Sequence, residues 1–315
     1  MRRLLSLLAF VPIVVVSLVA QQAQNPSPMV EHTRRHERLP AEPAPGGSRT
    51  PLATGTLFVP AKVTRAQAPL LVHFHGGALP AEVAGAANGL VVVSVQLGSG
   101  SSAYARPFSD PSAFASLLAE AEAKSGKRFT AVTLSGWSAG YGAVREILRV
   151  PAQYARVERV ILIDDIHTGY VGDAPGKGPG LESVLDPAPL DTFLQFARDA
   201  VAGKKRMTIT HSEIFPGTFA STTECTDWLL GQLHLPRRPV LAWGPMGLQQ
   251  LSDVRAGGFH LMGFAGNSAP DHVDQLHALP ALVKRSRVSA GAVTAASRRD
   301  DQSSGCRQRS SGNRA

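Results

Sequence analysis

Cysteine is nearly absent from this 315-residue chain, which contains only Cys225 and Cys306. Two cysteines exclude a small scaffold held by several disulfides, and a hydrophobic content of 43% supplies a substantial core without them. We interpret Cys225 as a buried small residue near the start of a helix that Ser221 or Thr222 caps, since no histidine-containing motif adjoins it. Sequence repeats with a period of about 20 to 50 residues are also absent, which excludes solenoids and propellers.

Acidic side chains are too few to balance the basic ones, and the chain carries a net charge of +8. The imbalance lies at the two ends, because Arg2 and Arg3 open the chain and residues 284–315 hold eight basic side chains against two carboxylates. Residues 4–283 are therefore neutral overall, so we expect no nucleic-acid partner. We predict that residues 284–315 form a basic disordered tail that binds anionic surfaces loosely at most.

A long hydrophobic run occurs only at the amino terminus, where residues 4–20 follow a basic start. This pattern predicts a secretory signal peptide over residues 1–23, and hence a periplasmic or secreted protein without a stable membrane span after cleavage. An uncleaved anchor is the alternative, disfavoured because Pro12 and Ser17 interrupt the run. No cysteine follows for a lipoprotein anchor, and residues 24–51 are predicted to be a flexible linker.

The rest of the chain alternates short apolar segments with segments of helical periodicity, which predicts an α/β domain over residues 52–283. We expect strands near Gly55–Val59, Leu70–Phe74, Leu90–Gln96, Ala131–Leu134, Val160–Ile163, Met207–Thr210, Val240–Trp243 and Phe259–Phe264. We expect helices near Pro111–Ser125, Tyr141–Arg149, Leu190–Val201, Thr222–Leu233 and His272–Val283.

One motif names a candidate nucleophile. The run Gly136-Trp137-Ser138-Ala139-Gly140 fits the pattern GxSxG, and it lies between a predicted strand and a predicted helix. That context is typical of a nucleophile elbow, in which a sharp turn exposes the serine hydroxyl and flanking glycines avoid collisions. The motif therefore assigns Ser138 as the nucleophile, with Trp137 packing against the neighbouring helix or lining the pocket.

A second segment supplies candidate donors for an oxyanion. The strand 69–74 ends in His75-Gly76-Gly77. An acyl carbonyl under attack needs two backbone N–H groups aimed at its oxygen, and we expect these from Ala139 and from either Gly76 or Gly77. His73 and His75 project to one face of a strand, but a zinc site usually needs a third nearby ligand, so no metal is expected.

The candidate base is His272, which lies in a loop between the last predicted strand and the last predicted helix. His260 lies within the strand and His277 within the helix, so we interpret both as structural. His32, His36, His211 and His234 have no motif around them and are interpreted in the same way.

The acid that would orient this base has two candidates. Asp164 directly follows the strongly apolar strand 160–163, whereas Glu213 follows the strand-like residues 207–210. Asp164 is favoured because it comes first after a strongly apolar strand, its side chain is short and stiff, and residues 166–170 resemble an ordered active-site loop. Asp165 is interpreted as a helix or turn cap and Glu213 as a solvated loop residue.

The elbow GWSAG, the turn HFHGG and the late segment GNSAPDH together resemble the α/β-hydrolase superfamily, from about Leu52 to Leu282. The resemblance implies an eight-stranded, mostly parallel sheet with helices on both faces. It also implies a triad of Ser138, His272 and one of the two acids, with no metal or organic cofactor. The uncertain acid departs from the commonest pattern, and Gly169–Pro189 and Phe215–Gly258 are predicted to form a small lid or substrate wall.

The expected function is that of an exported serine hydrolase that cleaves a small-molecule or polymer-linked carboxylic ester. The ester is preferred over a peptide bond because esterases are the commoner members of this superfamily. A peptidase or acyltransferase with the same triad and a catalytically dead binding protein remain alternatives. The complete set of nucleophile, oxyanion segment and base argues against the dead site.

Overall fold

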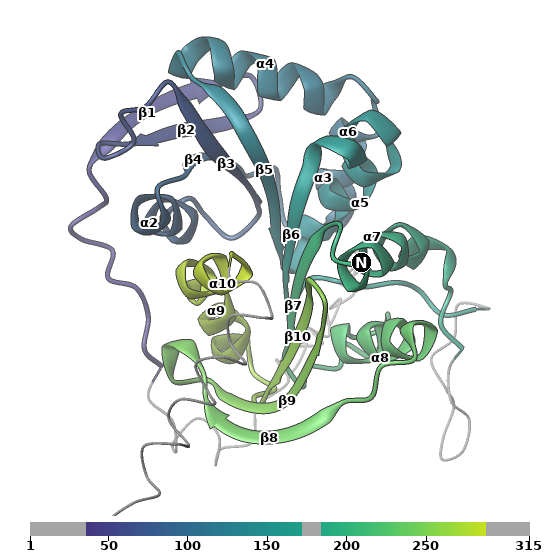
Figure 1. Ribbon diagram of the computed structural model, residues 1–315. Helices are drawn as coiled ribbons and strands as arrows, with labels where there is room; N and C mark the ends of the chain where they lie inside the picture. Colours follow the sequence, from purple (N-terminus) through teal and green to yellow (C-terminus); the bar gives the residue numbers. More distant parts are fainter. Residues whose placement is uncertain (1–35, 172–183, 288–315) are drawn as a thin grey trace, which may run out of the picture.

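A mixed sheet of ten strands crosses the whole domain (Figure 1). The computed structural model describes residues 36–171 and 184–287 of the chain. From edge to edge the strands are β1 (Gly47–Leu52), β2 (Gly55–Pro60), β4 (Val91–Val95), β3 (Gln67–Phe74), β5 (Arg128–Trp137), β6 (Val157–Ile163), β7 (Arg206–His211), β10 (Phe259–Phe264), β9 (Gln249–Ala256) and β8 (Arg238–Trp243). The six strands from β4 to β10 are parallel, and antiparallel strands complete both edges.

The sequence predicts eight of these strands, and the structure corrects the number to ten. The two additional strands are β1 and β9. The first begins at Gly47, inside the segment predicted to be a linker, and the second lies inside the segment Phe215–Gly258 predicted to be a lid. Both escape prediction because they carry few apolar side chains, as expected for strands at or beside the edge of a sheet.

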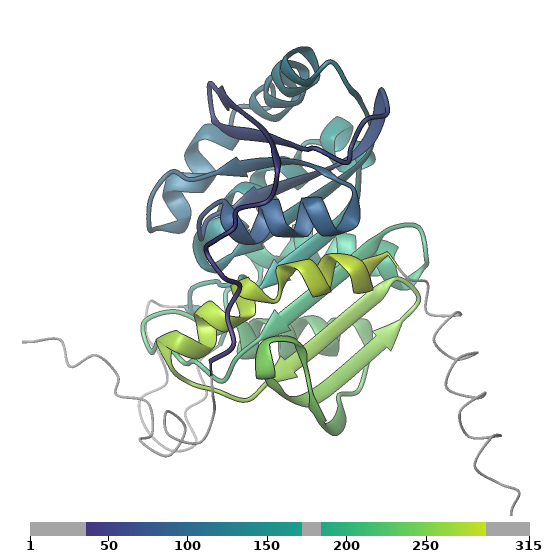
Figure 2. The same cartoon turned by 90° about the vertical axis from the view of Figure 1, so that its left-hand side faces the viewer.

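Helices cover both faces of the sheet, as the resemblance to α/β-hydrolases predicts (Figures 1 and 2). One face carries α2 (Leu79–Asn88), α9 (Ala269–His277) and α10 (Leu279–Ser286). The other carries α3 (Ser101–Phe108), α4 (Ala113–Ser125), α5 (Tyr141–Arg149), α6 (Pro151–Arg156), α7 (Asp191–Val201) and α8 (Thr222–Leu233). No helix within the described ranges has the length and hydropathy needed to cross a bilayer.

The central strands are buried on both faces. In β3 the side chains of Leu70 and Phe74 pack into the core under α3 to α8, whereas Leu71 packs into the core under α2 and α10. This alternation explains why the parallel strands are nearly continuous apolar runs in the sequence.

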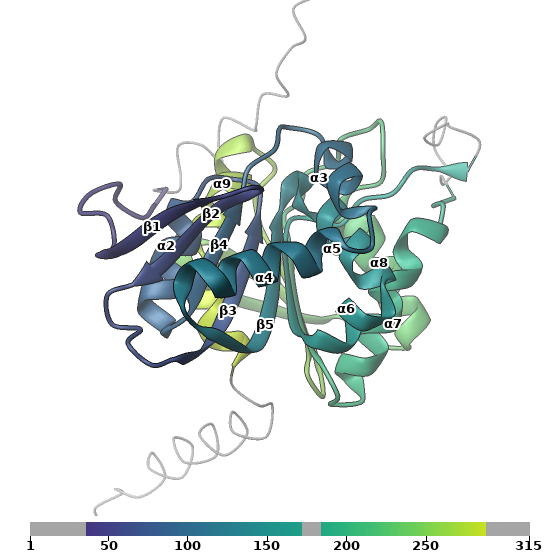
Figure 3. The ribbon, with the colours of Figure 1, turned by 90° about the horizontal axis from the view of Figure 1, so that it is seen from above.

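The edge formed by β1 and β2 is fastened to α4 (Figure 3). The carboxylate of Glu120 accepts a hydrogen bond from the Ala53 N–H at 3.0 Å, and Lys124 donates to the carbonyl of Pro51 at 2.7 Å. These contacts bring β1 into the folded domain although its own side chains are mostly exposed.

The chain order creates a switch point between β3 and β5. From β3 the chain crosses to β4 on one side and then returns to β5 on the other, so β3 and β5 are neighbours whose connections leave in opposite directions. Ligands of open α/β sheets bind outside the carboxyl ends of the strands at such a point. His75 and Ser138 directly follow these two strands.

Two helices begin with the caps that their sequences indicate. Ser221 caps α8 and Ser268 caps α9, each through a capping box with an acidic residue three positions later. Cys225 is fully buried in α8, as predicted, and burial raises the pKa of its thiol to about 12. The single helix predicted over 272–283 is instead two helices, and Pro280 lies in the first turn of the second. The first of them, α9, begins at Ala269, so His272 lies in its first turn and not, as the sequence predicts, in the preceding loop.

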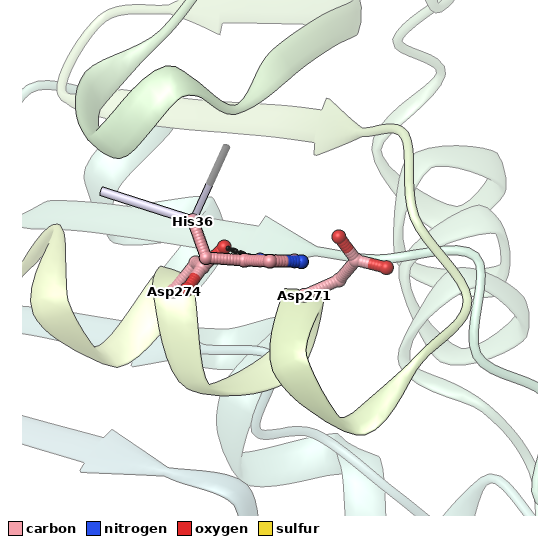
Figure 4. Close-up of side chains that lie close together, drawn as sticks. All are labelled: His36, Asp271 and Asp274. Atoms are coloured by element: carbon pink, nitrogen blue, oxygen red, sulfur yellow. Dashed lines mark hydrogen bonds and ion pairs between the residues drawn. The ribbon is translucent and has the colours of Figure 1, made fainter. Parts of the chain in front are cut away.

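The segment before β1 crosses the face covered by α9 and α10 (Figure 2). It is attached to α9 through Asp274, which accepts hydrogen bonds from His36 Nδ1 at 2.6 Å and Arg38 Nε at 2.9 Å. The Leu39 N–H also donates to His277 Nδ1 at 3.1 Å. Figure 4 shows the His36 ring lying between the carboxylates of Asp274 and Asp271. We call residues 36–39 with Asp274 and His277 the N-terminal clasp.

We predict that Asp274→Ala lowers the free energy of unfolding by about 2 kcal/mol, because it removes the buried carboxylate that holds the clasp. Urea denaturation followed by tryptophan fluorescence measures the change. Asp191→Ala, an exposed aspartate in the first turn of α7, is the matched control and should change stability by less than about 1 kcal/mol. Equal effects of the two substitutions would show that the clasp does not stabilise the fold.

Candidate active site

Three residues that directly follow parallel strands have left-handed backbone conformations. The φ angles are 72° for His75 after β3, 54° for Ser138 after β5 and 47° for Asp164 after β6. Non-glycine residues rarely adopt this region, and backbone strain of this kind gathers at functional sites. All three lie at the same edge of the sheet, because the carboxyl ends of parallel strands point the same way.

The glycines around Ser138 are required by close packing. A Cβ at Gly136 would collide with the carboxylate of Asp165, and one at Gly140 would collide with the Phe74 carbonyl. Ser138 itself is partly exposed, at the start of the one-turn helix η1 (Ser138–Gly140) that leads into α5. The strand, sharp turn and helix predicted for the elbow are therefore present.

Asp164 and His272 form a hydrogen-bonded pair. His272 Nδ1 lies 2.7 Å from Asp164 Oδ2, although the two residues are 108 positions apart in the chain. Ser212, at the end of β7, donates to the same carboxylate through its hydroxyl at 2.6 Å and its N–H at 3.0 Å. Since an ionised carboxylate only accepts, the proton in the pair lies on Nδ1, and Nε2 is left to accept a proton.

Asp164 stays ionised although it is buried. Burial acts to raise the pKa of this carboxyl, but the hydrogen bond and the electrostatic interaction with His272, together with the two hydrogen bonds from Ser212, outweigh burial and lower the pKa to about 2. A carboxylate that remains charged at neutral pH can fix the tautomer of a histidine and stabilise its protonated form.

Glu213, the alternative acid, is directed elsewhere. Its carboxylate is 41% exposed and lies 3.9 Å from Nδ1 of the buried His211, while its N–H donates to the Gly266 carbonyl. The structure therefore brings Asp164, and not Glu213, to His272. Ser212, which sequence reasoning missed, holds Asp164 from the adjacent strand.

Asp165 is buried next to Asp164 but has the opposite electrostatic character. Burial and the negative charge of Asp164 raise its pKa well above the ordinary value, against the lowering effect of a hydrogen bond from the Tyr141 N–H. That bond is 2.7 Å long and reaches the first residue of α5, in agreement with the predicted capping role. Its Oδ2 has no hydrogen-bond partner in the described chain.

The turn after β3 presents two glycines differently. Gly76 faces Trp137 and Leu276, whose atoms would lie 2.7 and 2.6 Å from an added Cβ. A Cβ at Gly77 would meet nothing within 4 Å, so this residue borders open space. Within the described residues, neither N–H donates to another backbone group, which leaves both available to a ligand.

His75 is held by a buried tyrosine. The Tyr104 hydroxyl donates to the Gly98 carbonyl at 3.0 Å and accepts from the Leu97 N–H. Because its one proton is used, the 2.8 Å contact with His75 requires Nδ1 of His75 to be the donor. Burial and the nearby charge of His272 lower the pKa of His75, so its neutral form is favoured.

Trp137 contacts both sides of the site. Its ring stacks on His75 at 5.1 Å between centroids and on His272 at 4.4 Å, with interplanar angles of 15° and 29°. The indole N–H donates to the His272 carbonyl at 3.0 Å. The sequence leaves open whether Trp137 packs against a helix or lines the pocket. In the structure it packs against His75 and against His272 of α9.

The segment predicted as a lid forms largely secondary structure. Residues 215–258 contain α8, β8 and β9, so most of this segment belongs to the sheet and its cover, which corrects the prediction. Trp243 is 73% exposed on the edge strand β8. The loop before α8 does approach the site, because Phe219 makes an edge contact with His167 at 5.0 Å. The other segment, Gly169–Pro189, lies partly outside the described residues.

Other histidines have structural partners. His260 contacts Asp253 at 2.8 Å, and buried His211 contacts Arg237 at 2.9 Å. His73 is fully buried beside Ser135, and burial lowers its pKa to about 3. His32 lies outside the described residues.

One group of side chains in the described residues has the composition of a cation site. The ligand atoms of His36, Asp271 and Asp274 all lie within 4.8 Å of one another (Figure 4). Ser268 already donates to Asp271, and the guanidinium of Arg38 already supplies positive charge beside Asp274. We therefore assign His36 and Asp274 to the N-terminal clasp and Asp271 to the capping box of α9.

Comparisons with known proteins find solved structures of low similarity only. No family model matches the chain, and no curated protein matches it. Among solved structures, an ester hydrolase from the metagenome of Lake Arreo is 13% identical, with a TM-score of 0.45 and coverage of 79% of this chain and 85% of that one. A truncated carbohydrate esterase from gut microbiota is 10% identical, with a TM-score of 0.45 and coverage of 78% and 98%.

A carboxylesterase from Bacillus subtilis is 13% identical, with a TM-score of 0.38 and coverage of 76% and 89%. Likeness at this level does not carry residue roles or an activity over to this chain. The roles of the site residues rest on the geometry described above.

We predict opposite effects of Asp164→Asn and Asp165→Asn on the pH dependence of stability. The lowered pKa of Asp164 adds stability that is present above its ordinary value of 3.8 and lost as pH falls toward about 2. Asp164→Asn should therefore lower the free energy of unfolding by about 2 kcal/mol at pH 7, and the difference should shrink in acid.

The raised pKa of Asp165 has the reverse sign, because above pH 3.8 the unfolded chain releases a proton that the folded chain keeps. Asp165→Asn should gain stability relative to the parent as pH rises from about 4 to 7. Urea unfolding at several pH values measures both differences. Parallel pH profiles for the two variants would contradict the assignment of one charged and one neutral carboxyl.

Proposed function

We propose that this protein is a serine hydrolase that cleaves carboxylic esters through an acyl-enzyme on Ser138. The observation that carries the proposal is the buried pair of Asp164 and His272, held by Ser212 at the strand end adjacent to the candidate nucleophile. A hydrogen-bonded acid and base beside a serine in a strained turn is the arrangement that activates a hydroxyl for acyl transfer.

In the proposed reaction, Ser138 Oγ attacks the acyl carbon while Nε2 of His272 takes the hydroxyl proton. Negative charge then develops on the carbonyl oxygen, and the N–H groups of Ala139 and of Gly76 or Gly77 donate to it. Gly77 borders open space, whereas Gly76 packs against Trp137 and Leu276. His272 returns the proton to the departing alcohol, and a water activated by the same base releases the acid.

Ester cleavage is proposed over peptide cleavage on the general frequency of these activities in the superfamily that the motifs resemble. A peptidase or an acyltransferase would use the same three residues and differ in its pocket and in the molecule that resolves the acyl-enzyme. A binding protein with an inactive site is the alternative from another class, and an ionised Asp164 that already orients His272 argues against it.

We expect a fluorophosphonate probe to label the purified protein on Ser138, and Ser138→Ala to abolish labelling. His272→Ala and Asp164→Asn should lower kcat on p-nitrophenyl acetate by about 10³-fold or more, because each disables proton transfer. Peptide mapping by mass spectrometry locates the label, and initial rates on ester and peptide substrates separate the two activities.

Glu213→Gln is the matched control for Asp164→Asn and should keep activity within about threefold of the parent, since Glu213 has no contact with His272. His234→Asn is the control for His272→Ala and should also keep the parental activity, because His234 is exposed at the left-handed end of α8. A folded parent that takes no label would refute the serine mechanism and favour the binding protein. Equal losses in Asp164→Asn and Glu213→Gln would refute the choice of acid.

Export is part of the proposal and rests on the signal-like residues 1–23. When the full-length protein is expressed in a host with a secretory pathway, we expect it to be exported from the cytoplasm and residues 1–23 to be cleaved off. Intact mass measurement of the exported protein checks the cleavage, and a variant with Leu5→Arg and Leu8→Arg in the apolar run is the control that should stay inside. Full-length protein retained in the cytoplasm of the host would refute export.

A further inference from the structure

The candidate base lies at one end of a stack of three aromatic rings. Trp137 stacks on His75, at 5.1 Å between centroids, and on His272, at 4.4 Å. Trp137 belongs to the end of β5, His75 follows β3 and His272 lies on α9, so the stack joins three elements of the site. The assignment of a role to this stack rests on the function proposed above.

Trp137 holds His272 at two points. Its N–H donates to the main-chain carbonyl of His272 at 3.0 Å, which fixes the position of the helical turn that carries the base. Its ring face lies against the imidazole, with 29° between the planes. An aromatic face attracts a cation within about 6 Å, and tryptophan does so most strongly. The imidazole becomes such a cation when it takes a proton from Ser138.

The other histidine stacked on Trp137, His75, favours the neutral form. Burial and the charge of His272 lower the pKa of His75, and Tyr104 accepts its Nδ1 proton. Three titratable groups surround His272. Asp164 is hydrogen-bonded to its Nδ1, and His75 and His167 are the two histidines whose pKa values burial and the charge of His272 lower. Of the three rings in the stack, His272 is the one with a carboxylate partner.

Trp137 also packs against the turn that would hold the oxyanion. An added Cβ at Gly76 would lie 2.7 Å from the indole ring, so only glycine allows this approach. The indole is thus in contact with the donor loop on one side and the base on the other, and it adjoins Ser138 in the chain.

We propose that Trp137 is a positioning residue for His272, whose indole N–H fixes the main chain of the base and whose ring face stabilises the imidazolium ion formed during catalysis. The catalytic step is unchanged: the proton moves from Ser138 Oγ to His272 Nε2 as the bond from Oγ to the acyl carbon forms. Trp137 makes no contact with the proton and acts only through His272.

The test compares Trp137→Phe, which keeps a ring face but loses the N–H, with Trp137→Leu, which loses both. We expect Trp137→Leu to lower kcat on p-nitrophenyl acetate by about 10- to 30-fold, and Trp137→Phe by about threefold. Loss of the ring face makes the protonated base less stable, so the acidic limb of the kcat/KM profile should move to lower pH by about half a unit in Trp137→Leu only. A role in packing alone would lower activity without moving this limb.

A second measurement does not depend on the folding of the leucine variant. Replacing all tryptophans biosynthetically by a fluorinated tryptophan weakens the negative potential of the ring face with little change of shape. We expect kcat of the parent to fall by about two- to fivefold. The same replacement in Trp137→Phe, which retains Trp228 and Trp243, should leave its kcat unchanged.

Trp243→Leu is the matched control for Trp137→Leu, because Trp243 is 73% exposed on the edge strand. It should keep the parental kcat and pH profile. If the probe labels Ser138 of the parent protein, but the Trp137 variants have the same kcat and the same acidic limb of the kcat/KM profile as the parent, only the role of Trp137 is refuted. A parent that takes no label would overturn the proposed function instead.

Discussion

The hydrogen bond between Asp164 and His272 is the contact on which the candidate site depends. It joins the end of β6 to the first turn of α9, two elements 108 residues apart, and it requires a buried carboxylate to remain charged. A lone carboxylate in this position would take up a proton rather than remain ionised. His272 does most to keep this carboxylate ionised, and Ser212 adds two further hydrogen bonds from the adjacent strand.

The parallel sheet positions the residues of the candidate site at one edge. His75, Ser138 and Asp164 each occupy the first position after a parallel strand, and each has a left-handed backbone. A strand that continued straight would carry these side chains away from the edge of the sheet. The sharp reversal turns them toward the open end instead, and the packed layers of helices on both faces maintain the strained conformations.

Much of this arrangement is predictable from the sequence. The features that sequence patterns did not predict have physical reasons in common. Ser138, the glycines of the HGG turn and the parallel strands are local patterns, because the elbow and buried strands impose their constraints on adjacent residues. Asp164 could be favoured over Glu213 only through local features, namely its position directly after a strongly apolar strand, its short side chain and the loop that follows it. Ser212, Tyr104 and the N-terminal clasp could not be found, since their partners are distant in the chain and no local pattern encodes them. Strands β1 and β9 were missed because strands at or beside an edge need little apolar surface.

Adjacent carboxyls at the end of a buried strand pose an electrostatic problem that this fold answers by dividing their roles. Two charges this close in a buried site repel, and this repulsion together with burial raises the pKa of Asp165. Asp164 accepts hydrogen bonds from Ser212 and His272, whereas Asp165 lies against Gly136 of the elbow and accepts from a single N–H of α5. Asp165 thus supports the turn that carries Ser138, while Asp164 orients His272. The turn of the nucleophile and the ring of the base are therefore both held by one dipeptide.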